Sequence, residues 1–305
     1  MRDSLKTAVK DTIILECHLP CSASGIGSSC LSISSPQADS CFSHTSNTKL
    51  SHIIYNGIVE FAINQYKIDY NALDLEQRQT IARRIKYSST GTQTEKLKHG
   101  FYGEVLLDLI LRCHLNTDVL IARGYFYSVL EDSEPKGFDV FHLLERNNEL
   151  ELWFGEAKFH ATYRTAIKQV LEKIHTSLSD GYVSKNLIAL IDWDDKISTP
   201  NSHLSNLLSA WEANPDINLA TEMKIRNISL VYPVFIAYEK TDKMNYHNNI
   251  KSCIDYIEEQ TKKLNITIPA TFDYRISFIF LPVDEVKKVK ETVIEWIENQ
   301  EPLMP

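Results

Sequence analysis

The segment 137–159, GFDVFHLLERNNELELWFGEAKF, contains two apolar stretches on either side of the pair Asn147-Asn148. Asparagine tolerates the left-handed backbone of tight turns, so the segment predicts two antiparallel strands joined by a two-residue turn. Positions equidistant from such a turn face each other. Asp139 is then opposite Glu156, with the backbones about 4.5–5.5 Å apart and both side chains on one face. Lys158 shares that face because side chains alternate along a strand.

These three charged residues are surrounded by apolar sequence. Large apolar side chains occupy both faces of the predicted hairpin, as in strands that are covered on both sides. Two neighbouring carboxylates repel each other, and burying them without a partner is unfavourable. Lys158 offsets one charge, and a divalent cation offsets the rest. Oxygen ligands suit Mg²⁺, which can polarise a phosphodiester and activate a bound water. The alternative interpretation is a solvated charged face.

The spacing of these residues resembles the PD-(D/E)XK nucleases. Asp139, sixteen intervening residues and Glu156-Ala157-Lys158 match the pattern of an acid on one strand and Glu-x-Lys on the next, although Gly-Phe-Asp replaces Pro-Asp. The resemblance implies an α/β fold with a mixed central β-sheet flanked by helices, a restriction-endonuclease-like core and an N-terminal helical and loop extension. It also implies that Asp139, Glu156 and the main-chain carbonyl of Ala157 bind Mg²⁺ or Mn²⁺. Two further catalytic candidates lie on the neighbouring helices: Glu104 and Gln169.

A narrower stretch, from about residue 100 to 178, is similar to the HamA family, the nuclease subunit of the Hachiman anti-phage system. The similarity rests on Gly103-Glu104, on residues 137–139 and on residues 153–159. It implies an effector that cleaves DNA when licensed by a superfamily 2 helicase partner, HamB-like. Two alternatives stay open: a non-catalytic subunit that regulates a helicase complex, and an RNase on the same scaffold.

The composition sets limits on these hypotheses. The chain has 305 residues, of which 43% are apolar and 24% charged, as in a globular protein. We expect a cytoplasmic protein without membrane contact, because no secretory signal or membrane-length apolar run is evident. The net charge of −8 argues against strong DNA binding by the chain alone. A local basic patch or a partner must then supply the affinity. The basic residues of segment 78–98 contact nucleic acid or form a solvated face.

The hydrophobic pattern predicts two regions. Residues 1–94 are expected to hold a strand, a Ser-rich loop and helices, and residues 95–305 the nuclease-like core. The individual elements expected are strands at 12–19, 119–130, 137–145, 149–160, 186–192, 228–238 and 273–282, a loop at 22–47, and helices from 51, at 75–84, 95–114, 162–178, 201–213, 246–264 and 284–299.

Overall fold

The fold is taken from a computed structural model that describes residues 1–19, 39–85, 87–126, 137–146, 149–191, 203–214, 217–242 and 245–304. The strands are β1 (Ile13–His18), β2 (Ser40–His44), β3 (Asp118–Val119), β4 (Val140–Arg146), β5 (Glu149–His160), β6 (Ile228–Glu239) and β7 (Tyr274–Val283). The helices are α1 (Asp3–Thr12), α2 (Asn47–Ala62), α3 (Leu73–Arg83), α4 (Gln93–Lys98), α5 (Phe101–His114), α6 (Tyr163–Ser177), α7 (Asp180–Ile191), α8 (His203–Glu212), α9 (Leu219–Ile225), α10 (Tyr246–Leu264) and α11 (Val286–Asn299). Short 3₁₀ helices occupy Gln65–Lys67, Tyr70–Ala72 and Arg123–Phe126.

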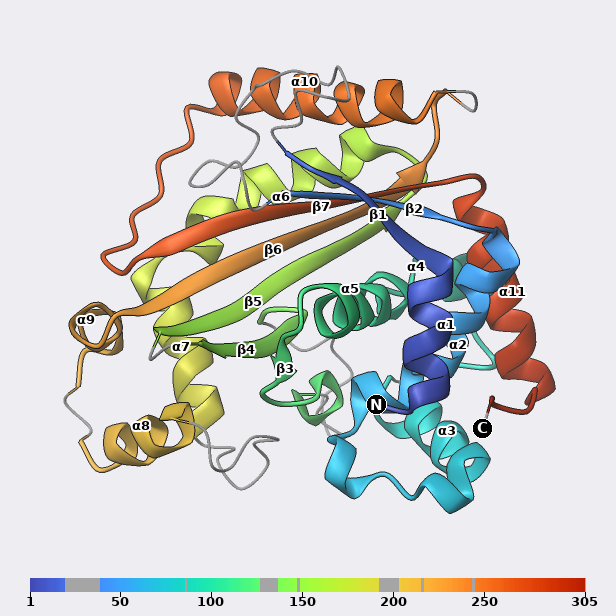
Figure 1. Ribbon diagram of the computed structural model, residues 1–305, viewed down its shortest axis with the longest axis horizontal. Helices are drawn as coiled ribbons and strands as arrows, with labels where there is room; N and C mark the ends of the chain where they lie inside the picture. Colours follow the sequence, from blue (N-terminus) through green and yellow to red (C-terminus); the bar gives the residue numbers. More distant parts are fainter. Residues whose placement is uncertain are drawn as a thin grey trace.

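Within the described residues, seven strands form one mixed sheet in the order β1-β2-β7-β6-β5-β4-β3 (Figure 1). The β4–β5 hairpin is antiparallel, whereas β5, β6 and β7 run parallel to one another. The connections between parallel strands carry helices, as such crossovers require. The predicted fold class, an α/β fold with a mixed central sheet flanked by helices, is confirmed.

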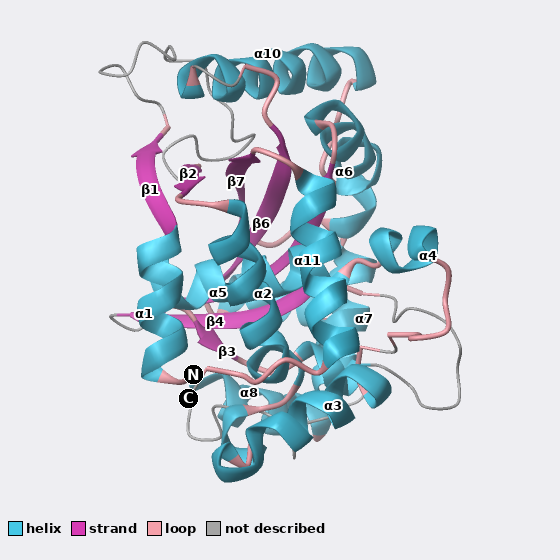
Figure 2. Ribbon diagram, turned by 90° about the vertical axis from the view of Figure 1, so that its right-hand side faces the viewer, coloured by secondary structure: helices cyan, strands magenta, loops and turns pink. Residues whose placement is uncertain are grey.

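Helices cover both faces of the sheet. Helices α6 and α10 lie on one face, and α1, α2, α5 and α11 lie on the other (Figures 1 and 2). Alternate residues of β5 follow this division: Leu152 and Phe154 join the core under α6, and Trp153 and Phe159 join the core under α5. Strand β5 is therefore buried on both faces, and a charged side chain within it requires a partner.

Residues 1–94 contribute to the same sheet as the rest of the chain. Strand β2 pairs with β7, and α2 packs against α5 and α11. The two ends of the chain also meet, because the Arg2 guanidinium donates to the Met304 carbonyl over 2.6 Å (Figure 2). The division at residue 94 stays a prediction.

Most predicted elements are present, with four corrections. Residues 186–192, expected as a strand, belong to helix α7 as far as Ile191. The helix expected at 95–114 is two helices, α4 and α5, separated at His99-Gly100. The loop expected at 22–47 contains strand β2, and the strand expected at 119–130 is only the end of β3 followed by a 3₁₀ helix. Residues 22–38 and 127–130 of these two segments, and the Asn147-Asn148 turn, lie outside the described residues. In the described part of the chain, no helix has the length and apolarity needed to cross a membrane.

Candidate active site

The register of the β4–β5 hairpin is the one that a turn at residues 147–148 predicts. Arg146 pairs with Glu149, and the pairing continues to Val140 opposite Gly155. One residue further the backbone departs from this register. The Asp139 amide donates to the Gly155 carbonyl over 2.8 Å, so Asp139 and Val140 share one partner, as in a β-bulge. The shift moves Asp139 out of the ladder and points its side chain along β5.

The Asp139 carboxylate is held by the backbone of the Glu-Ala-Lys motif. Its Oδ2 accepts a hydrogen bond from the Ala157 amide over 2.8 Å. This amide is free to donate because β4 has already ended beside it and because alternation directs it away from β6. Gly155 is required next to it, since a Cβ there would lie 2.3 Å from both the carbonyl oxygen and Cγ of Pro233 in β6.

Glu156 and Lys158 form an ion pair on the α6 side of the sheet. The second carboxylate oxygen of Glu156 accepts a hydrogen bond from the Tyr232 hydroxyl of β6 over 2.9 Å. The side chains of Glu156 and Lys158 are 16% and 17% exposed, so both are shielded but reachable from solvent. The Glu156 carboxylate is therefore held by two partners, the buried Tyr232 hydroxyl and the partly exposed Lys158 ammonium.

Helix α5 contributes a third acid, Glu104, and a basic residue lies between this acid and Asp139. Arg123, in the 3₁₀ helix after β3, lies 3.9 Å from Glu104 and 4.0 Å from Asp139. Its side chain is only 4% exposed. Helix α5 can approach this closely because Gly103 has no side chain; a Cβ there would lie 3.3 Å from the Cβ of Phe159. The sequence pair Gly103-Glu104 therefore brings an acid next to the hairpin.

Charge and burial act on these groups together. Burial raises the pKa of Asp139, and the positive charges of Lys158 and Arg123 only partly oppose this effect. Burial alone would lower the pKa of Lys158, but the carboxylates of Glu156, Asp139 and Glu104 raise it overall. Lys158 is therefore a stable cation, whereas ionised Asp139 gains from any further positive charge nearby.

The donor set suits a hard divalent cation. Asp139 and Glu156 supply carboxylate oxygens, and the alternation that directs the Ala157 amide toward Asp139 puts its carbonyl on the same strand edge. Three acids face two basic side chains, an excess of one negative charge. No group of three Asp, Glu, His or Cys side chains in the described ranges forms a complete cage. Mg²⁺ needs none, since it commonly keeps several waters and binds through one or two carboxylates.

The comparison with protein families decides the identity of the chain. The family model of HamA matches residues 16–297, which include every residue of this site. The chain belongs to the HamA family. HamA proteins are components of Hachiman, a multi-component anti-phage defence system. No curated protein and no solved structure matched the chain.

In this HamA-family chain, the predicted site residues do not all meet. Asp139, Glu156 and Lys158 are adjacent, and Glu104 joins them through Arg123. Gln169 is half-buried on α6, and its side chain hydrogen-bonds His160, two positions beyond Lys158.

Sequence analysis missed Arg123 and Tyr232. Both reach the site through long-range packing, and neither belongs to a local sequence motif. A tyrosine within an apolar strand, or an arginine that follows a short strand, does not by itself indicate a functional residue.

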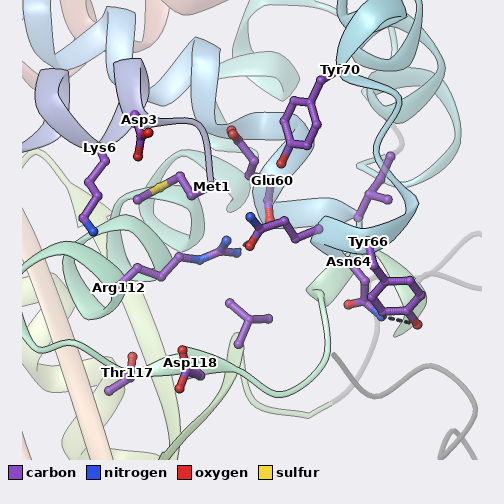
Figure 3. Close-up of a pocket in the computed structure, with 13 residues that line it drawn as sticks. Met1, Asp3, Lys6, Glu60, Asn64, Tyr66, Tyr70, Arg112, Thr117 and Asp118 are labelled. Carbon is purple, nitrogen blue, oxygen red and sulfur yellow. Dashed lines mark hydrogen bonds between the residues drawn. The ribbon is translucent and has the colours of Figure 1, made fainter. Parts of the chain in front are cut away.

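A second polar cluster lies in a separate part of the HamA fold. Asp108, one turn after Glu104, receives a hydrogen bond or ion pair from His142 and from Arg112, each over 2.9 Å. Arg112 also lines a pocket of about 610 Å³ near the N-terminus, where it lies close to Met1 and Glu60 (Figure 3). None of the hairpin acids lines this pocket. Asp108 is therefore tied to the packing of α5 rather than to the candidate active site.

Proposed function

We propose that this protein is the metal-dependent nuclease of a Hachiman complex and cleaves phosphodiester bonds in DNA. The observation that carries the proposal is the joint placement of Asp139, Glu156 and Lys158 at the end of the β4–β5 hairpin. The three groups are linked through the Ala157 amide and the Glu156–Lys158 ion pair. A buried strand rarely carries such a cluster without a catalytic or ion-binding purpose.

Asp139, Glu156 and the Ala157 carbonyl would hold the cation, Mg²⁺ or Mn²⁺, since both ions prefer carboxylate and carbonyl oxygens. When bound, the ion supplies Lewis acidity to the phosphodiester and lowers the pKa of a coordinated water. The protein's part is to keep these oxygens in place. The Ala157 amide orients Asp139, and the Tyr232 hydroxyl orients Glu156.

Lys158 is the group suited to contact the reacting phosphate. Its raised pKa keeps it protonated at neutral pH, and its side chain is partly open to solvent. An ammonium at this position orients the attacking water and stabilises the negative charge that grows on the phosphate oxygens. The Glu104 carboxylate on α5 helps to keep Lys158 protonated. Gln169 does not contact the cluster itself; its side chain hydrogen-bonds His160 and holds that imidazole in place.

The acidic character of the chain fits an enzyme that depends on a partner. A net charge of −8 disfavours the association of the free protein with a polyanion. We propose that a superfamily 2 helicase, HamB-like, delivers DNA to the site and licenses cleavage.

Cleavage of labelled DNA by the chain purified with its helicase partner tests the proposed function. Degradation should require Mg²⁺ or Mn²⁺, stop with a chelator, and fall at least about 100-fold in Asp139→Asn. Asparagine keeps an acceptor for the Ala157 amide, so the fold is preserved. Cleavage that survives both Asp139→Asn and Lys158→Met would overturn the assignment, and cleavage of RNA alone would redirect it to an RNase.

A further inference from the structure

A groove of about 360 Å³ adjoins the candidate active site at the end of β5. Its ionisable lining is entirely basic in a chain whose net charge is −8. The lining residues come from β5, from the junction of α4 and α5, and from the first turns of α11: Ala157, Lys158, Phe159, His160, Ala161, Leu97, Lys98, His99, Gly100, Val286, Lys287 and Lys290. A concave surface with one sign of charge concentrates ions of the opposite sign.

Lys290 is the most unusual of these residues. It is 9% exposed, and its ammonium donates to the main-chain carbonyls of Leu97 and Phe159 over 3.1 and 3.0 Å. Among the described residues, no carboxylate pairs with it, and burial lowers its pKa to about 8. A nearly buried cation without an anion carries a desolvation penalty that an anionic occupant of the groove would reduce.

The backbone reinforces the positive character of the groove. The edge of β5 beyond Ala157 is not paired with β4, and Lys290 caps this edge at Phe159. Helices α5 and α11 both begin at the groove, and neither N-cap residue, Gly100 or Glu285, caps its helix with its side chain. At α5 the Phe101 amide donates to Nδ1 of His99 over 3.4 Å. Helix first turns with unsatisfied amides carry partial positive charge, although Glu104 in the first turn of α5 and Glu285 at α11 oppose it.

We propose that this groove binds the phosphodiester backbone of the nucleic-acid strand that enters the active site, with Lys98 and Lys287 contacting phosphates and Lys290 supplying buried positive charge. Both contact residues are exposed, Lys98 at the end of α4 and Lys287 in the first turn of α11. Ala157 and Lys158 line the groove and also belong to the hairpin cluster, so a strand lying in the groove passes next to the candidate active site. This inference specifies how the substrate of the proposed nuclease is held.

Binding measured without metal separates this inference from catalysis. Fluorescence anisotropy would follow a labelled single-stranded DNA of about 20 nucleotides and the full chain in chelator, starting at about 20 mM salt. On a single strand, each lost phosphate contact should lower the slope of log affinity against log salt by about 0.7, so Lys98→Gln with Lys287→Gln should lower it by about 1.4. The double variant should lower the salt slope for an RNA of the same sequence by the same amount, because DNA and RNA share the phosphodiester backbone.

Lys251→Gln is the matched control. Lys251 is exposed on α10 and pairs with Asp255 four residues later, as Lys287 pairs with Glu291, but it lies outside the groove. Its slope should equal that of the wild type. An unchanged slope in the double variant, an equal loss in Lys251→Gln, or no binding by the wild type at low salt would each overturn the groove assignment. A groove that binds DNA while metal-supplemented protein never cleaves it would refute the proposed function alone.

Discussion

At the scale of single residues, Arg123 explains how three acids can lie near one another before any metal binds. Its guanidinium is nearly buried and sits about midway between Glu104 and Asp139, 3.9 and 4.0 Å away. A charge in this position offsets the repulsion that would otherwise disfavour the hairpin end. A divalent ion beside Asp139 would share this environment, so Arg123 and the ion compete for the same negative charge.

Lys290 leads to a prediction about pH at the same scale. Its pKa is about 8 in the folded chain against an ordinary value of 10.5. Between these values the unfolded chain binds more protons, so the free energy of unfolding rises with pH, by about 3 kcal/mol in total. Urea denaturation of wild type and Lys290→Met at pH 7 and above 10 would measure this. The rise in the free energy of unfolding between the two pH values should be absent from Lys290→Met. The same pH dependence of stability in both proteins would contradict the prediction.

At the scale of elements, the β5–β6 pairing depends on the absence of a side chain at Gly155. An added Cβ would lie 2.3 Å from the Pro233 carbonyl oxygen, which cannot move without separating the two strands. Gly155→Ala should therefore reduce the free energy of unfolding by about 3 kcal/mol or more. Gly181→Ala in α7 is the control, because nothing lies within 4 Å of its added Cβ and helical alanine is favourable. Equal stability of the two variants would contradict the close approach.

The elements that sequence patterns predict well are those whose pattern is local. Helix α10 begins and ends where its apolar periodicity does, and the hairpin register follows from the position of two asparagines. The apolar run at 186–191 was misassigned because periodicity cannot distinguish a short buried strand from the end of a helix. Strand β2 has little apolar character, and only its pairing with β1 and β7 defines it.

The three central residues of the site could be predicted from the sequence, whereas the residues that contact them from other elements could not. Asp139, Glu156 and Lys158 lie in one hairpin, so turn chemistry and strand alternation suffice to bring them together. Arg123 and Tyr232 arrive from other parts of the chain, and their placement depends on the complete sheet. The bulge at Asp139 was also unforeseen, because a two-residue turn implies an uninterrupted ladder.

At the scale of the whole molecule, the N-terminal region packs against the rest of the chain. Strand β2 extends the sheet beside β7, and Gly57 of α2 packs against Leu109 and Val105 of α5. A chain that begins at residue 95 would expose these apolar surfaces. We expect it to lack cooperative thermal unfolding and to aggregate, as measured by circular dichroism and light scattering. A soluble, cooperatively folded fragment would contradict this and support an independent domain.

Two glutamates on β5 allow the central claim to be tested by one matched comparison. Glu156 lies in the proposed site, whereas Glu151 lies on the same strand and pairs with Arg275 over 3.1 Å. The measurement is the rate of DNA cleavage with Mg²⁺ by the chain and its helicase partner, for wild type, Glu156→Gln and Glu151→Gln. The account predicts a loss of at least about 100-fold in Glu156→Gln and a rate near that of wild type in Glu151→Gln. Cleavage by Glu156→Gln at the wild-type rate would contradict it.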